Sequence, residues 1–447
     1  MNRLVLPVLL ALALGGCRTT TRAGPLSAAT LAMLGSLKQP VLVRAFISEK
    51  LPRPLQGKAR GMQAMLRAYA KASPKIDLRV LDPKKDDAAQ LSALEHGVEP
   101  LQLQIKQRNK MEVKRVYFSV VFSRGKQRRV LSGSTEIGRR LEYRISAQIH
   151  GVSRSSTVAF ATGHGEPSAA DELSSQLEKL EGFKIISADL TRGKGAVPAG
   201  ADVLVLVGPR KPMGEAARME IDQMLMAGKA AVYLVDGMVM KEAAGERDAM
   251  DLNKNVVGLQ KQMAGYGVEI NHDVVMNKRT KATVVMSGTF MSAVLPEPYV
   301  AVGDFNQGSP ITGGVRQQIA VGPCSMKLAR GVNNSSPGLR GTVLLRSSAN
   351  TWRKSDAFRL TRAEQKPTKQ RGPFPLAVHL QGAFRSASPK LRQTRSPKTA
   401  QLVVIGGAGV VKNESVDMLA QNPDLLRRTL EVVTLPAGIA KLWSAKR

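Results

Sequence analysis

Apolar runs that alternate with amphipathic helical patterns constrain the fold of this chain more than any other feature of its sequence. The runs Ala201–Val207, apolar apart from Asp202, and Ala230–Val235 lie on either side of Gly214–Ala227, which carries apolar residues at helical spacing. Short apolar runs of this kind are typical of strands buried on both faces of a sheet. The alternation predicts an α/β fold with an open, mainly parallel sheet over residues 153–447. In this part we also expect helices at 171–180 and 252–266 and a last strand, 401–405, that closes the sheet.

The first part of the chain shows a different order of elements. A chain of 447 residues exceeds what one hydrophobic core organises, so a separate domain is expected here. The expected elements are strands 41–47, 76–81, 101–105, 116–122 and 128–131 and helices 57–72, 88–96 and 135–149. This order is that of a thioredoxin-like domain, which we expect over residues 39–152. It lacks Cys-x-x-Cys, so the redox chemistry of that fold is not expected.

Residues 1–17 have the pattern of a bacterial lipoprotein signal. Arg3 supplies a positive start, Leu4–Leu14 is apolar, and a small-residue pair precedes Cys17. In such signals the Cys is acylated and becomes the mature N-terminus, so Cys17 is the predicted lipidation site. Residues 18–38 are small, polar and weakly patterned, and we expect them to form a tether.

Cysteine usage limits the chemistry of the folded part. The chain has two cysteines, so if Cys17 carries lipid, only Cys324 remains. Neither an intramolecular disulfide nor a cysteine metal site can then form. We expect Cys324 to be a small buried hydrophobe without reactivity.

Positive charge is the most unusual bulk property. Lys and Arg number 66 against 35 Asp and Glu, a formal net charge of +31 that favours polyanionic neighbours such as anionic lipid or an acidic envelope polymer. The basic residues are spread along the chain and form no aromatic-interleaved module, so we do not expect nucleic acid as the partner. The stretches 353–371 and 385–398 are expected to be basic surface insertions, the second of them mobile.

Candidate site residues follow the apolar strands. The loop after the run 156–161 consists of Gly163, His164, Gly165, Glu166 and Pro167, and we expect a second part of the same crevice at Gly208, Pro209 and Asp236. Open α/β sheets bind ligands at the carboxyl ends of their strands, so a ligand or partner loop is one interpretation. The other interpretation is a tight turn that needs Gly163 and Gly165, because glycine adopts backbone conformations that other residues disfavour. No metal is expected, because the chain has only five His.

Two catalytic patterns are missing from the sequence. Gly57, Gly125, Gly193 and Gly228 each precede a Lys, but no Ser or Thr follows, so no phosphate-cradling loop is present. No Gly-x-Cys-x-Gly or Gly-x-Ser-x-Gly stands between a strand and a helix. The sequence therefore favours a protein that is neither an ATPase nor an enzyme.

Several motifs in order resemble GldG-type auxiliary proteins of ABC transporters, which are associated with gliding motility. The motifs are Phe46–Pro52, Val80–Pro83, Thr162–Pro167, Val207–Pro209, Asp304–Asn306, Ser309–Thr312, Ser348–Trp352, Pro375–Val378 and Val403–Gly407. The resemblance implies a thioredoxin-like domain followed by a flavodoxin-like domain related to glutamine amidotransferases. It also implies an ABC permease and ATPase as partners. Members commonly carry transmembrane helices, whereas here a lipoprotein signal is expected to supply the anchor.

The leading hypothesis is therefore a non-catalytic, lipid-anchored accessory component of an ABC transport system, substrate-binding-like or assembling, without a cofactor. It would face the periplasm from the inner or the outer membrane. One alternative is an envelope hydrolase of sugar or amide bonds that uses Glu166 and Asp236, which both follow strands. A second alternative is a basic nucleic-acid-binding protein, which requires an N-terminus that is not an export signal.

Overall fold

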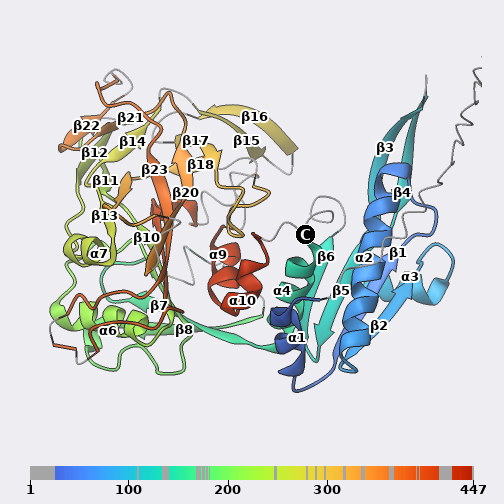
Figure 1. Ribbon diagram of the computed structural model, residues 1–447. Coiled ribbons are helices and arrows are strands. Elements are labelled where there is room, and N and C mark those ends of the chain that lie inside the picture. Colours follow the sequence, from blue (N-terminus) through green and yellow to red (C-terminus); the bar gives the residue numbers. More distant parts are fainter. Residues whose placement is uncertain are drawn as a thin grey trace, which may run out of the picture.

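Two sheets and their helices organise the chain (Figure 1). The computed structural model describes residues 26–444 except 108–109, 133–139, 168–172, 174–176, 178–179, 181, 246–248, 278–279, 287–288, 296–298, 316–318, 334–337, 362–366, 389, 392 and 412–424. Cys17 and the predicted signal lie outside the described residues, as do most of the helix expected at 171–180 and the start of the helix expected at 135–149.

The N-terminal body is a four-stranded sheet in the order β2-β1-β5-β6. Its strands are β1 (Val41–Ile47), β2 (Ile76–Leu81), β5 (Phe118–Arg124) and β6 (Gln127–Ser132), and its helices are α2 (Arg53–Ala72), α3 (Asp87–Glu95) and α4 (Leu141–Ser153). β1 runs parallel to β2 and antiparallel to β5, and β5 and β6 form the predicted hairpin. Buried residues of α2 and α4 share one core, while Ala93 of α3 packs into a second core.

A separate hairpin departs from the sequence prediction. The strand expected at 101–105 exists as β3 (Leu101–Gln107), but its partner is β4 (Lys110–Val116), a strand that the sequence analysis did not anticipate. The two strands form a sheet of their own beside the four-stranded one. Charged residues interrupt the sequence of β4, so no apolar run marks this strand and its pairing with β3 defines it.

The large body contains a nine-stranded sheet in the order β18-β17-β20-β23-β24-β10-β9-β7-β8. Its parallel strands are β7 (Ser156–Thr162), β8 (Phe183–Asp189), β9 (Val203–Val207), β10 (Ala230–Val235) and β24 (Gln401–Gly406). Its antiparallel part consists of β17 (Tyr299–Phe305), β18 (Ile319–Val321), β20 (Leu339–Ser347) and β23 (Pro375–Gly382). The predicted α/β class with an open parallel sheet is confirmed, and the antiparallel strands extend it.

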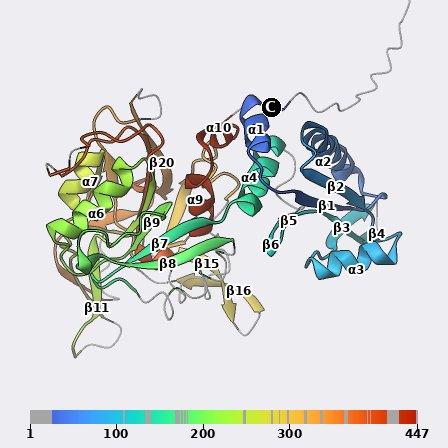
Figure 2. The same ribbon diagram turned by 90° about the horizontal axis from the view of Figure 1, so that it is seen from below.

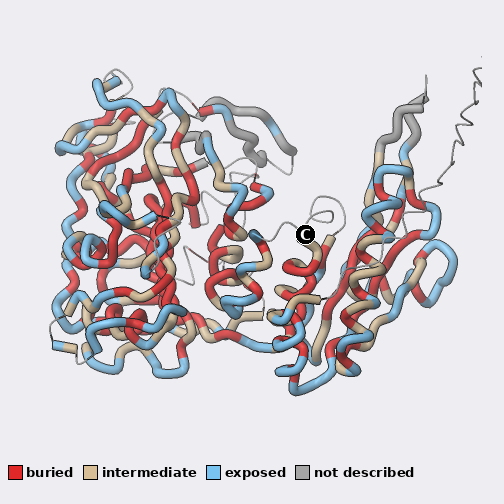
Figure 3. Tube along the Cα trace, in the orientation of Figure 1, coloured by how far each residue is buried: buried red, intermediate tan, exposed pale blue. Residues whose placement is uncertain are grey.

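Helices cover both faces of this sheet (Figure 2). Buried residues of α6 (Glu215–Met226) and α7 (Gln260–Tyr266) pack on one face, and those of α9 (Leu425–Val433) pack on the other. β9 and β10 are buried along their whole lengths, and Figure 3 shows this buried centre. Burial on both faces explains why these strands are continuous apolar runs in the sequence.

Short sheets rim the large body. They are β11 (Met238–Glu242) with β12 (Met250–Lys254) and β22 (Phe358–Leu360), β13 (Val268–Ile270) with β19 (Met326–Leu328), β14 (Val274–Met276) with β21 (Trp352–Lys354), and β15 (Thr280–Met286) with β16 (Thr289–Leu295). The sequence predicts one helix over 252–266. The structure corrects this, because β12 occupies its start and a turn at Gly258, with φ of +80°, separates that strand from α7.

Two further expectations are corrected. The strand at 401–405 was expected to close the sheet, but β24 lies inside it between β10 and β23. The insertion at 385–398 was expected to be mobile, but the hydroxyl of Ser386 donates to Asp222 of α6 at 2.5 Å, and Ser396 is buried. The sequence did not reveal this contact because the partner carboxylate lies 164 residues away.

Part of the predicted tether is a helix. α1 (Ala28–Gly35) is capped by Ser27, whose hydroxyl accepts a hydrogen bond from the Thr30 N–H at 3.2 Å. Glu142 of α4 accepts from the Ser27 N–H at 2.6 Å and from the Thr30 hydroxyl at 2.7 Å. Residues 28–35 therefore belong to the folded body, and the small residues that suggested a tether serve close helix packing.

The C-terminal segment completes the core of the N-terminal body. Leu435, Ile439 and Trp443, on and beside α10 (Ala437–Lys441), are buried among the residues of α1, α2 and α4. The Trp443 ring meets Tyr143 edge to face at 5.1 Å, and Arg140 lies 4.1 Å from the Trp443 ring centre. The expectation that 153–447 form one independent unit is thus corrected, since residues 435–443 pack with the other body.

A buried ion pair also joins the large body to the N-terminal body, at what we call the junction. Arg129 of β6 donates to Glu431 of α9 at 2.8 Å, and their side chains are only 10% and 21% exposed. Burial lowers the pKa of Arg129, and Glu431 opposes that effect by stabilising the charged guanidinium. Gly151 of α4 makes room for the guanidinium, because a Cβ there would lie 2.4 Å from the Arg129 Cζ. The pair fixes α9 against the N-terminal sheet.

We expect Trp443→Ala to reduce the free energy of unfolding by about 3–5 kcal/mol, because it removes a buried ring and leaves a cavity. Urea denaturation followed by circular dichroism measures the change. Leu94→Ala is the control, since Leu94 is 74% exposed on the N-terminal body and should change stability by less than about 0.5 kcal/mol. Equal stability of Trp443→Ala and the parent chain would contradict this account of the junction.

Candidate functional site

The predicted site residues meet at the carboxyl ends of the parallel strands. β7 is the first strand of the sheet along the chain, with β8 on one side and β9 on the other. The strand order therefore reverses direction between β7 and β9. Open α/β sheets form ligand crevices at such a switch point, because neighbouring loops leave in opposite directions.

The loop after β7 is fastened to the loop after β9. The carbonyl of His164 accepts from the N–H groups of both Arg210 and Lys211 at 2.8 Å. Gly163 and Gly165 have φ values of +104° and +79°, which favour glycine and turn the chain sharply. His164 is only 7% exposed as a result. The structure thus brings the predicted loop and the Pro209 region together.

Glu166 shapes this loop from within. Its Oε2 accepts from the backbone N–H of His164 at 2.7 Å. One carboxylate oxygen therefore holds the backbone of the turn and is not free for a ligand. The other oxygen, Oε1, is buried and has no hydrogen-bond partner among the described residues.

Gly208 and Asp236 link the carboxyl ends of β9, β10 and β24. Gly208 donates to the Leu234 carbonyl at 2.7 Å, and Asp236 Oδ1 accepts from the Ala408 N–H at 2.7 Å. Gly208 has φ of +50°, and a Cβ there would lie 2.7 Å from the Ala408 Cβ. Asp236 thus organises the loop after β24, which the sequence did not associate with this crevice.

Asn255 lies among these loops, although the sequence does not indicate it. Its Nδ2 donates to the carbonyls of Pro209 and Asp236, both at 3.0 Å, so it bridges the loops after β9 and β10. Its Oδ1 is buried without a partner in the described part of the chain. Only the fold could reveal it, because it follows the short strand β12 in a segment that reads as helical.

Three buried polar atoms on these adjoining loops have no partner among residues that the structure describes: His164 Nδ1, Glu166 Oε1 and Asn255 Oδ1. Buried polar atoms without hydrogen bonds are rare, because each costs about 1–3 kcal/mol. The side chains of Arg210 and Lys211 are exposed beside them. These loops therefore combine three unsatisfied polar atoms with two exposed cations beside them.

Cys324 lies near the carboxyl end of β10 and is fully buried. It is 0% exposed, and its thiol donates to the Val235 carbonyl at 3.4 Å. Burial raises the pKa of Cys324, and the neighbouring carboxylates of Asp273 and Asp236 raise it further. The thiol is therefore protonated and inaccessible, and the prediction of a small buried hydrophobe is confirmed.

The two carboxylates of the hydrolase alternative have structural roles. Glu166 holds the His164 N–H, and Asp236 holds the Ala408 N–H. No group of three or more His, Cys, Asp or Glu able to hold a metal occurs within the described ranges. None of the helices that the structure describes is long and apolar enough to cross a membrane.

The fold is thus an α/β sheet with its switch point at β7 and β9. The family described as ABC-type uncharacterized transport system matches residues 155–429, more than half of the chain. The chain belongs to this family and is an accessory component of an ABC transport system. A domain of unknown function matches residues 25–123. A comparison with curated proteins gave no match.

Similar solved structures include the mmIFT52 N-terminal domain, at 14% identity and a TM-score of 0.39, covering 63% of this chain and 99% of that one. A putative thua-like protein from Parabacteroides merdae is similar at 10% identity and a TM-score of 0.33, covering 63% of this chain and 91% of that one. At these scores the likeness carries no argument.

We expect Gly208→Ala to destabilise the chain more than Gly125→Ala. Both positions have φ near +50°, at +50° and +57°, so each alanine costs about 1–2 kcal/mol in the left-handed region. Only Gly208→Ala adds a Cβ against Ala408, which should cost about 1–3 kcal/mol more. Urea denaturation of both variants measures the difference. Equal losses would show that the strand ends are not packed as described.

Proposed function

We propose that this chain is a non-catalytic, lipid-anchored accessory subunit that docks on the permease and ATPase of an ABC transport system from outside the cytoplasm. The observation that carries the proposal is the family match over residues 155–429 together with the lipoprotein pattern that ends at Cys17. The GldG type of auxiliary protein is the form we propose.

The anchor is supported by the arrangement of the N-terminal sequence. α1 begins at Ala28, so residues 18–27 separate Cys17 from the folded body. Even fully extended, this segment spans no more than roughly 36 Å, since each residue contributes at most about 3.6 Å. An acylated Cys17 would therefore hold the body close to the membrane surface, where a permease could contact it.

Two observations support a role in binding rather than catalysis: the sequence has no phosphate-binding loop, and the candidate catalytic side chains are buried or hydrogen-bonded to the backbone. None of the four Gly-Lys pairs is followed by Ser or Thr, so the chain lacks the phosphate loop of the ATPase subunit. The thiol of Cys324 is buried and protonated, and Glu166 and Asp236 hold backbone N–H groups. These groups would have to be released before they could act as nucleophile, acid or base.

The crevice at the switch point is the proposed contact for a ligand or partner. It consists of Gly163, His164, Gly165, Glu166 and Pro167, with Gly208, Pro209 and Asp236. The cations Arg210 and Lys211 at its rim favour an acidic group, such as a carboxylate-bearing loop of the permease. Asn255 and His164 would supply the polar contacts inside.

The domain assignment is also part of the proposal. The sheet order β2-β1-β5-β6 with helices on both faces supports a thioredoxin-like N-terminal body without a Cys pair. The parallel sheet with its switch point supports a flavodoxin-like second body. We place the boundary near residue 153 and assign residues 435–443 to the junction of the two.

Mass spectrometry of the full chain from bacterial membranes tests the proposal. We expect loss of residues 1–16, a diacylglyceryl group on Cys17, and copurification of a permease and an ATPase. Cys17→Ala should leave the membrane fraction while its folded body, measured by circular dichroism, stays unchanged. His164→Ala should reduce copurification, whereas His96→Ala on the N-terminal body is the control.

A mature chain that retains Met1, or that purifies alone in soluble form with nucleic acid bound, would contradict the proposal and favour the basic-binder alternative. Turnover of cell-wall fragments that is lost in Glu166→Gln would favour the hydrolase alternative instead.

A further inference from the structure

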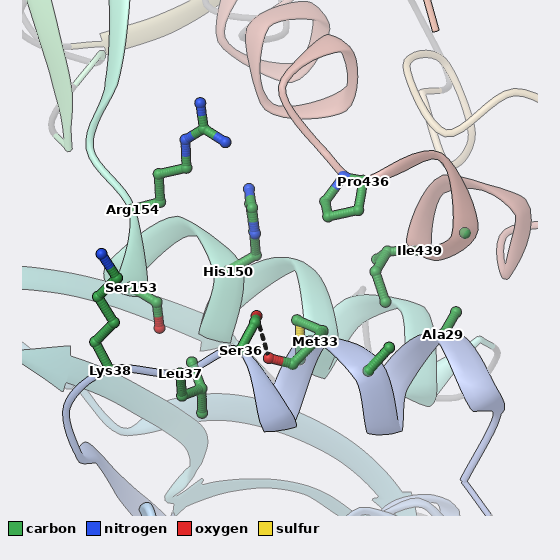
Figure 4. A pocket seen from close by; sticks show the side chains of 12 residues that line it. Ala29, Met33, Ser36, Leu37, Lys38, His150, Ser153, Arg154, Pro436 and Ile439 are labelled. Carbon is green, nitrogen blue, oxygen red and sulfur yellow. Dashed lines mark hydrogen bonds between the residues drawn. The ribbon is translucent and has the colours of Figure 1, made fainter. Parts of the chain in front are cut away.

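A cavity lies where the C-terminal segment meets the N-terminal body (Figure 4). Its volume is about 750 Å³, within the size range of ligand pockets. It is bounded by α1, α4 and the segment around α10, so neither body forms it alone. It is distinct from the crevice at His164, which lies at the strand ends of the large sheet.

One side of the cavity is apolar. Met33 and Leu37 line it from α1 and the residues after it, and Pro436 and Ile439 line it from the C-terminal segment. Ala32 also lines it and is exposed, so no large side chain fills the space at that point of α1. A wall of this composition favours an alkyl chain, because contact with it removes apolar surface from water.

The other side is polar and positively charged. Lys38, His150, Ser153 and Arg154 line it, and no Asp or Glu does. Arg154 pairs with Asp202 at 2.6 Å through one Nη atom, while Lys38 makes no ion pair with a residue that the structure describes.

His150 is placed between these two sides. Figure 4 shows its ring rising from α4 toward Pro436, beside Arg154. Burial lowers the pKa of His150, and the charge of Arg154 lowers it further, so the ring is neutral near pH 7. Its Nε2 is buried and has no hydrogen-bond partner among the described residues. An anion in the cavity would balance the charge of Lys38 and would accept a hydrogen bond from His150 Nε2 once the ring is protonated, which a neighbouring negative charge favours.

We propose that this cavity binds an amphipathic anion, a molecule with a carboxylate or phosphate head and an alkyl tail. The head lies between Lys38, His150 and Arg154, and the tail runs along Met33, Leu37 and Ile439. Because the lining comes from α1, α4 and the C-terminal segment together, the ligand stabilises their packing and raises the resistance of the chain to unfolding.

Calorimetric titration of the full chain carrying Cys17→Ala tests the site without an attached lipid. Dodecanoate and dodecyl phosphate, each below its micelle concentration, are the anionic probes, and their relative affinities distinguish the two head groups. We expect saturable binding of one molecule per chain by at least one of them. Dodecyl maltoside has the tail without the charge, and acetate and inorganic phosphate have the charge without the tail. Each should bind at least roughly tenfold more weakly, the loss expected for one charge-assisted hydrogen bond or a few buried methylenes.

Two variants locate the site. Lys38→Glu should weaken binding of the anionic probes by roughly tenfold or more, because it reverses a charge at the head group. Ala32→Trp should abolish binding by filling the space, and the exposure of Ala32 allows the larger ring without disturbing the core. Lys50→Glu is the matched control, with the same charge change at an exposed position outside the cavity lining, and should bind like the parent chain.

Equal affinity for dodecyl maltoside and the anionic probes would overturn the assignment of an anionic head. Unchanged affinity in Ala32→Trp, with the variant shown to be folded by circular dichroism, would overturn the assignment of the site. Neither outcome depends on acylation of Cys17 or on a permease, so failure here is distinguishable from failure of the proposed function.

Discussion

Packing of the C-terminal segment into the N-terminal core is the interaction on which the arrangement of this protein depends. Trp443 lies among aromatic and guanidinium groups of the first body, while the chain that leads to it comes from the second. The ion pair of Arg129 and Glu431 is largely buried at the same junction. Breaking such a pair leaves an uncompensated charge out of water, so the two bodies are held in one relative position.

The molecule also has two separate places where we propose that other molecules bind. The crevice at His164 depends on the parallel sheet, because its loops follow β7, β9 and β10 and are fastened to one another by backbone hydrogen bonds. The cavity beside His150 depends on the junction, because α10 forms one wall. In the functions proposed above, a permease would contact the first place and an amphipathic anion would bind in the second. The net charge of +31 suits both, since each site presents cations at its rim.

Much of the large body could be predicted from local pattern. The strands β7, β9, β10 and β24 are apolar runs because they are covered on both faces, and the glycines after them mark their ends. The antiparallel half was harder, because β17, β18 and β20 gain stability from cross-strand partners that the sequence does not place beside them. For the same reason, Asn255 could not be recognised as a residue of the crevice.

The sequence by itself determined the α/β class, the positions of the parallel strands, the loop from Gly163 to Pro167 and the absence of a phosphate loop, because each depends on residues that are neighbours along the chain. The tertiary structure alone decided that α1 is folded, that β24 lies inside the sheet, and that Trp443 belongs to the first core. These features join segments that are more than a hundred residues apart, and their energy comes from surfaces that exist only after both partners have folded.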